Sequence, residues 1–220
     1  AWGLGACEHP ELTFSREFVN GKHNVMHDLL KWDYEQKAQY SRNYLRDYKA
    51  SGMHDTNNTG VPFISYGKPP LGTWDPVANV LHGVDGDPQM NRTFLSSNVG
   101  IEGENDQNVT KYLVGGRYKL SGGEIQYPDK GEHLGKMVYE MTSMPDARRH
   151  KENFTVLHEY IDGYKEAMDA GGFNRGQSRF GYNHSHLRRI SGAILGPYMH
   201  DIAYQMQSSK ADLLHYSEYP

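Results

Sequence analysis

Two histidines four residues apart, His23 and His27, lie in the segment KHNVMHDLL, whose apolar spacing predicts a helix. Side chains at i and i+4 project from one helix face, so both imidazoles could bind one metal ion. A complete site needs further ligands, and His184 and His186 in the segment NHSH form a second chelating pair. Zinc, iron or copper would suit this set. This metal site is the alternative. The expectation is that His23 and His27 are structural and hydrogen-bonded beside the apolar stripe that contains Met26, and that the protein has no cofactor.

Sequence motifs that would complete a metalloenzyme are missing. No Glu is followed by His at the third position, as di-iron bundles require. The segment HEYID at His158 lacks the second His of the zinc peptidase pattern. Serine and cysteine nucleophile motifs are also absent from the sequence. The sequence therefore leaves open whether the protein is an enzyme. If it is, we expect a secreted metal-dependent enzyme that uses His23 and His27 with a distant ligand.

Residues 171–189 form a basic island, because they contain arginines and aromatic rings but no acidic residue. Such a surface suits an acidic protein groove or a nucleic-acid backbone. The net charge of −4 and the isoelectric point near 6.3 favour a protein partner, with nucleic acid as the second choice. The predicted partner-binding residues are Arg175, Arg179, Arg188, Arg189, Phe180 and Tyr182.

Asn-x-Ser/Thr sequons occur at five positions, which exceeds the one or two expected by chance from this composition. Sequons that carry glycans indicate a secreted or surface glycoprotein. The alternative is that an Asn-rich chain collects them by accident. Asn153 falls in a predicted helix, so the predicted glycosylation sites are Asn57, Asn91, Asn108 and Asn183.

The aliphatic content is low, since Leu, Val, Ile and Phe together provide 41 of 220 residues. The 16 tyrosines argue against disorder, because tyrosine buries a large ring and keeps a polar tip at interfaces. This composition favours a chain that completes its burial against other subunits. The single cysteine, Cys7, excludes an intrachain disulfide and a zinc site built on paired thiolates.

The expected fold is α+β, with two or three helices packed on a loop-rich region of short, antiparallel strands. An extended arm is expected over residues 1–21, followed by a single domain over residues 22–220. Within this domain, we expect helices over about 23–49, 144–170 and 186–209. Ser143 with Asp146 is the expected N-terminal cap of the second helix, and Gly196-Pro197 should kink or split the third. The expected strands VPFIS, VANVL and KYLVGGRYKL lie in region 52–131.

These features together favour a non-enzymatic structural or interaction subunit of a larger oligomeric assembly. The expected setting is extracellular, at a cell surface or in a virion, although a cytoplasmic one stays open. No apolar run reaches the 18 or so residues that span a bilayer, so no membrane span is expected.

Overall fold

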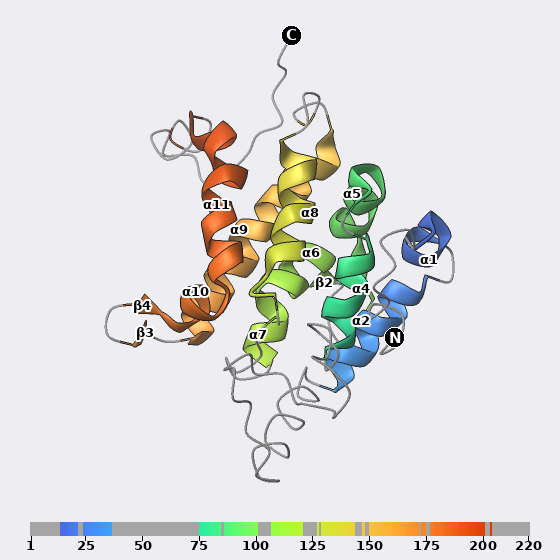
Figure 1. Ribbon diagram of the computed structural model, residues 1–220, viewed down its shortest axis with the longest axis horizontal. Coiled ribbons are helices and arrows are strands. Elements are labelled where there is room, and N and C mark those ends of the chain that lie inside the picture. The colour runs from blue at the N-terminus through green and yellow to red at the C-terminus, as the bar shows by residue number, and fades with distance from the viewer. Residues whose placement is uncertain are drawn as a thin grey trace, which may run out of the picture.

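Helices dominate the part of the chain that the computed structural model describes, namely residues 14–21, 24–36, 75–84, 86–100, 107–120, 127, 129–143, 147, 150–171, 173–174, 177–200 and 203 (Figure 1). Strands in this part are limited to two antiparallel pairs of two residues each. β1 (Asn98–Val99) pairs with β2 (Gln107–Asn108), and β3 (Phe173–Asn174) pairs with β4 (Gln177–Ser178). The expected α+β class, with two or three helices on a loop-rich region of short antiparallel strands, is therefore wrong.

The longest helix, α9 (Lys151–Gly171), lies at the centre of the bundle and contacts helices from most other parts of the described chain (Figure 1). Helix α11 (Ser185–Leu195) packs on α8 (Glu132–Thr142) and continues into the 3-10 turn η3 (Gly196–Tyr198). The remaining helices are α1 (Arg16–Asn20), α2 (Val25–Glu35), α4 (Pro76–Val84), α5 (Pro88–Ser96), α6 (Val109–Lys111), the π-helix η1 (Tyr112–Gly116), α7 (Arg117–Leu120) and α10 (Arg179–Asn183).

Two of the three expected strands are helical. VANVL belongs to α4, where the side chain of Asp75 accepts hydrogen bonds from the backbone N–H groups of Val77 and Ala78 and so caps the helix. Short apolar runs fit a buried strand or a buried helix equally well, and α4 buries its apolar side chains at helical spacing. KYLVGGRYKL forms the continuous helix α6–η1–α7. VPFIS lies outside the described residues.

Two glycines let η1 cross α9 at close range. A Cβ atom on Gly115 would overlap the carbonyl oxygen of Gly163. A Cβ atom on Gly163 would lie 2.9 Å from the carbonyl oxygen of Lys111. Any side chain at this crossing would force the two backbones apart, so Gly115 in KYLVGGRYKL serves helix packing.

The helix boundaries differ in detail from those expected. Helix α2 occupies residues 25–35 of the expected 23–49, and residues 37–49 lie outside the described residues. Helix α9 begins at Lys151, and Ser143 is the C-cap of α8 instead. Helix α11 ends at Leu195, just before Gly196-Pro197. Within the expected N-terminal arm, residues 16–20 form α1, whose Val19 is fully buried.

Candidate functional site

The first predicted metal ligand in the described chain, His27, is held by a hydrogen bond. Its Nε2 lies 2.9 Å from Ser97 Oγ, and the Ser97 hydroxyl donates to the carbonyl of Phe94 at 2.6 Å. Because that hydroxyl has one proton, His27 Nε2–H is the donor. Burial and the nearby Lys31 lower the pKa of His27, which favours the neutral ring. His23 lies outside the described residues.

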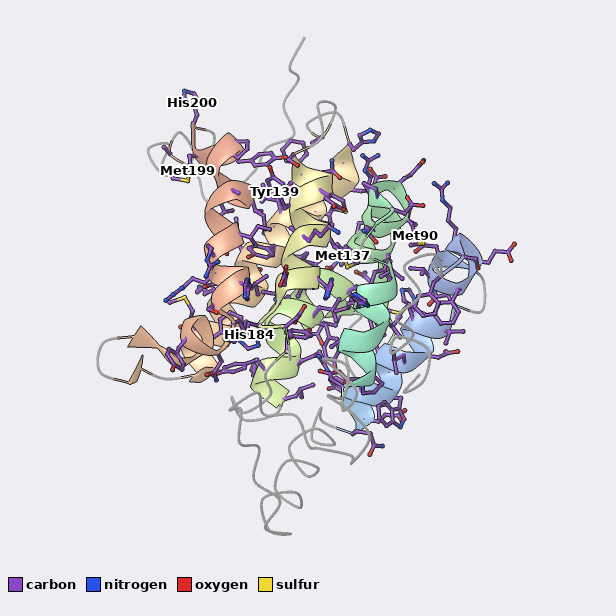
Figure 2. All side chains as sticks on the ribbon, in the orientation of Figure 1. Met90, Met137, Tyr139, His184, Met199 and His200 are labelled. Carbon is purple, nitrogen blue, oxygen red and sulfur yellow. The ribbon has the colours of Figure 1, made fainter. Side chains whose placement is uncertain are left out.

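The second, His184, is buried where α10 meets α11 (Figure 2). Its Nδ1 donates to the carbonyl of Phe180 at 3.2 Å, and the ring contacts Phe180, Tyr118 and Tyr127. Burial lowers its pKa to about 4. His186 is partly exposed on α11. In the described chain, no group of three close metal-ligating atoms includes His27, His184 or His186, and a metal site on them stays a prediction.

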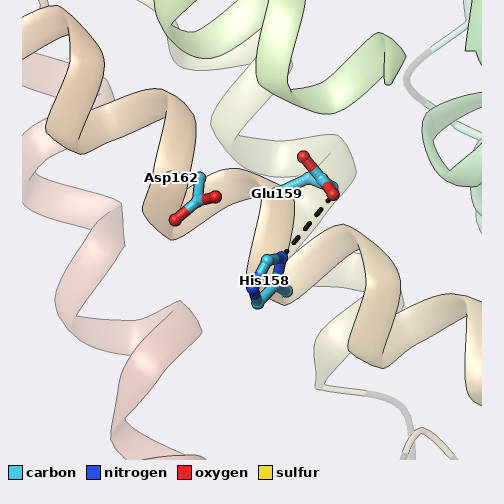
Figure 3. A group of neighbouring side chains, drawn as sticks. All are labelled: His158, Glu159 and Asp162. Atoms are coloured by element: carbon cyan, nitrogen blue, oxygen red, sulfur yellow. Dashed lines mark ion pairs between the residues drawn. The ribbon is translucent and has the colours of Figure 1, made fainter. Parts of the chain in front are cut away.

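A different group, His158, Glu159 and Asp162 on α9, brings three donor atoms within 4.8 Å of one another (Figure 3). His158 Nδ1 lies 3.6 Å from Glu159 Oε1. Asp162 is also 3.8 Å from the ammonium of Lys111, which lies 3.6 Å from Glu166 as well. A positive charge beside the carboxylates opposes binding of a second cation. This group therefore acts as an ion-pair cluster between α6 and α9.

A buried charge network that the sequence patterns did not predict surrounds Arg117, on the first turn of α7. The guanidinium forms bidentate ion pairs with Asp33, at 2.6 and 3.1 Å, and with Asp75, at 3.1 and 3.3 Å. Both carboxylates are fully buried, and the hydroxyl of Tyr112 also donates to Asp33 at 2.7 Å. Burial and the Asp33 charge raise the pKa of Tyr112. The available sequence signal was the position of Asp33, three residues after Leu30 on an apolar stripe.

The network links α2, the start of α4 and the helix α6–η1–α7, so its role is to hold these elements together. Arginine satisfies two carboxylates at once because its fork presents five N–H donors in one plane. The ring of Tyr127 lies 5.0 Å from the guanidinium and adds a cation–π contact.

A cavity lies between α9 and α11, as an open groove with a volume of about 510 Å³. The two helices run antiparallel, since Tyr160 lies opposite Ser191 and Phe154 lies opposite Tyr198. The Ser191 hydroxyl donates to the Leu187 carbonyl, so the hydroxyl of Tyr160 donates to Ser191, at 2.6 Å. The lining residues are Tyr160, Ile161, Tyr164, Lys165, Met168, Asp169, Arg188, Ser191 and Leu195.

The groove is open because α11 packs on α8 rather than on α9. A Cβ atom on Gly135 of α8 would lie 2.6 Å from the Cγ2 atom of Ile190, so this glycine lets α11 approach α8 closely. On the α9 side, the buried ring of Tyr160 bridges to Ser191 and keeps the helices apart. The result is a channel with an aromatic floor formed by Tyr160 and Tyr164.

Three charged side chains line the groove: Lys165, Asp169 and Arg188. None of them forms an ion pair with any other residue that the structure describes. Lys165 and Asp169 are one helical turn apart on α9, and both are exposed. Arg188 lies across the groove near Tyr164, whose pKa is raised by burial and lowered in part by that guanidinium.

The predicted basic island reaches this groove only in part. Arg188 lines the groove, whereas Arg189 is exposed on the same helix outside the lining. Phe180 is fully buried against Tyr164, with ring centroids 5.1 Å apart, so it supports the floor. Tyr182 is 72 % exposed. Arg175 and the side chain of Arg179 lie outside the described residues.

The predicted glycosylation sites occupy different environments. Asn91 is fully buried in α5, and its amide has no hydrogen-bond partner among the described residues. The side chain of Asn108 caps α6 and donates to the carbonyls of Ser96 and Ser97. Asn183 is partly exposed, and Asn57 lies outside the described residues. Glycosylation stays a prediction at all four positions.

Comparisons of this chain with protein-family models, with curated proteins and with solved structures give no match. Among the described helices, none has the length and apolar character needed to cross a membrane.

Proposed function

We propose that this protein is a non-enzymatic interaction subunit that binds a protein partner in the groove between α9 and α11. The observation that carries the proposal is the groove itself, an open channel with an aromatic floor and three charges that lack a partner in the described chain. Apolar grooves between helices with charged rims are typical sites for helical protein segments.

The use of the other polar side chains supports binding rather than catalysis. His27, His184 and Arg117 are each hydrogen-bonded or ion-paired within the chain. A catalytic group must instead present a free donor, acceptor or nucleophile to a substrate. The groove, in contrast, presents the exposed charges of Lys165, Asp169 and Arg188.

Side chains flanking the groove extend its apolar surface. Ile161 is 36 % exposed in the lining, and Met199, just beyond α11, is 53 % exposed (Figure 2). Tyr182 follows Gly181, at which a Cβ atom would lie 3.4 Å from Arg188 and 3.8 Å from the Tyr164 hydroxyl. Exposed apolar side chains in and near a groove suit a protein partner better than a small molecule.

Photo-crosslinking in cells tests this function. A photoreactive phenylalanine analogue replaces Ile161 in the groove or, as the control, exposed Thr93 on α5. We expect a discrete protein adduct from position 161 and none from position 93, with both partners identified by mass spectrometry of the crosslinked peptides. Equal crosslinking at both positions, or none at position 161, would contradict the proposal.

A further inference from the structure

We infer that the partner in the α9–α11 groove is a second copy of this chain, related by a two-fold axis. This inference rests on the proposed function, because it names the occupant of the same groove. Its basis is that the groove carries charges of both signs, with Lys165 and Arg188 as the cations and Asp169 as the anion.

Two-fold symmetry makes this charge pattern self-complementary. In a two-fold dimer, if one residue contacts another across the interface, the reciprocal contact also forms. When two copies of α9 run antiparallel across the axis, Lys165 of each copy can face Asp169 of the other. Arg188 of each copy then reaches the same carboxylate from across the groove. Each Asp169 carboxylate is then paired with two cations, and each copy keeps one excess positive charge at the interface.

The shape of the surface also fits face-to-face stacking. The α9 residues that line the groove run from Tyr160 to Asp169, or about 14 Å along the helix axis. The α9 ridge of each copy can enter the groove of the other, and four helices then form two stacked layers. Specific interfaces bury about 800 Å² per partner, so the contact must extend over the exposed Ile161, Met199 and Tyr182.

Charge exchange between two positions tests this geometry. Sedimentation velocity from about 1 μM to about 1 mM measures the dimerisation of four proteins. These are the unaltered chain, Lys165→Asp, Asp169→Lys and the double variant Lys165→Asp/Asp169→Lys. We expect the unaltered chain to dimerise with increasing concentration. Each single variant places like charges across the axis and should weaken dimerisation at least about tenfold. The double variant restores opposite charges between positions 165 and 169 and should dimerise more strongly than either single variant.

Mixing the two single variants gives the sharpest result. One variant then carries acids at both positions and the other carries lysines, so only the heterodimer pairs opposite charges across the interface. We expect a heterodimer in the mixture at concentrations where each variant alone is monomeric. Lys151→Asp and Glu152→Lys make the same charge changes at exposed positions of α9 outside the groove, and these controls should dimerise as the unaltered chain does.

A monomeric unaltered chain over the whole concentration range would overturn the inference. A dimer that Lys165→Asp and Asp169→Lys leave intact would overturn it too, as would single variants that fail to associate when mixed. Circular dichroism confirms that each variant is folded. If the crosslink from position 161 identifies a different protein and the chain is monomeric, the groove still binds protein and only the second copy is excluded as its partner.

Discussion

At the scale of single residues, the guanidinium of Arg117 holds a buried position that a neutral side chain cannot fill equally well. It is 1 % exposed and forms ion pairs with two carboxylates that are themselves fully buried. Burying such ions is costly, and the ion pairs offset this cost only while both partners are present. The network therefore holds three elements in register, and its value for stability depends on completeness.

Replacing Arg117 with Met should destabilise the protein by about 3 to 5 kcal/mol, because Asp33 and Asp75 would remain buried without their cation. Urea unfolding followed by circular dichroism measures this loss. Arg189→Met, at an exposed position, is the matched control and should stay within about 0.5 kcal/mol of the unaltered chain. Equal stability of the two variants would show that the network contributes nothing.

His184 should make the protein less stable in acid. Its pKa is lowered from 6.5 to about 4 by burial, so the unfolded chain takes up the proton first as the pH falls. The free energy of unfolding is fully maintained above pH 6.5 and should fall by up to about 1.4 kcal/mol per pH unit toward pH 4. Among neighbouring charges, Asp129 raises this pKa and Arg117 lowers it.

The His184→Phe variant keeps an aromatic ring in the cluster but cannot titrate. Its unfolding free energy is measured by urea titration at a series of pH values. The slope of this free energy against pH should be smaller in this range, by an amount that corresponds to the uptake of up to one proton. The lowered pKa of His27 acts in the same direction in both proteins, so the difference between them isolates His184. Identical slopes would contradict a buried, neutral His184.

The hydrogen bond between His27 and Ser97 predicts a small loss of stability when it is removed. His27→Gln should cost about 1 kcal/mol, the value of one hydrogen bond, because Nε2 already donates to a hydroxyl. Chemical denaturation measures this cost, and elemental analysis measures the metal content beside it. About one equivalent of zinc, iron or copper, lost in the variant together with a far larger loss of stability, would support the predicted metal site instead.

At the scale of elements, the crossing of η1 and α9 depends on the absence of side chains. Gly115→Ala should destabilise the protein by at least about 2 kcal/mol, because the new methyl group would overlap the carbonyl oxygen of Gly163. Gly192 lies within α11 with no atom within 4 Å of its Cβ position. Gly192→Ala should therefore stabilise the protein by about 0.5 to 1 kcal/mol. Thermal unfolding of both variants checks that they differ in sign.

At the scale of the whole molecule, self-association should depend on Arg188 and on salt. Arg188→Ala should weaken the dimer and reduce its sensitivity to sodium chloride, because an exposed charge contact is screened by ions. Sedimentation at low and high salt gives both quantities. Arg189→Ala removes the same charge outside the groove lining and should change neither. Indistinguishable behaviour of these two variants would argue against a specific role for the groove.

Local sequence patterns were informative where one helix buries one stripe. The apolar spacing over residues 154–168 reflects α9, and Gly196-Pro197 marks the end of α11. The same patterns failed for VANVL and KYLVGGRYKL, because a short run that is apolar on all sides carries no period that separates strand from helix. Burial on nearly every face of these segments explains the misleading pattern.

The sequence alone determined the composition, the charge, the motifs that are absent and the residues whose side chains can donate hydrogen bonds or bind a metal or a partner. It also made Arg188 a partner-binding candidate, because a cluster of arginines without acidic residues can be recognised from the sequence. Only the tertiary structure decided which of these side chains meet. The pairing of Arg117 with Asp33, 84 positions apart, and the groove between α9 and α11 both depend on long-range helix packing. No local period encodes such contacts, because each is set by the shapes of two surfaces that fold together.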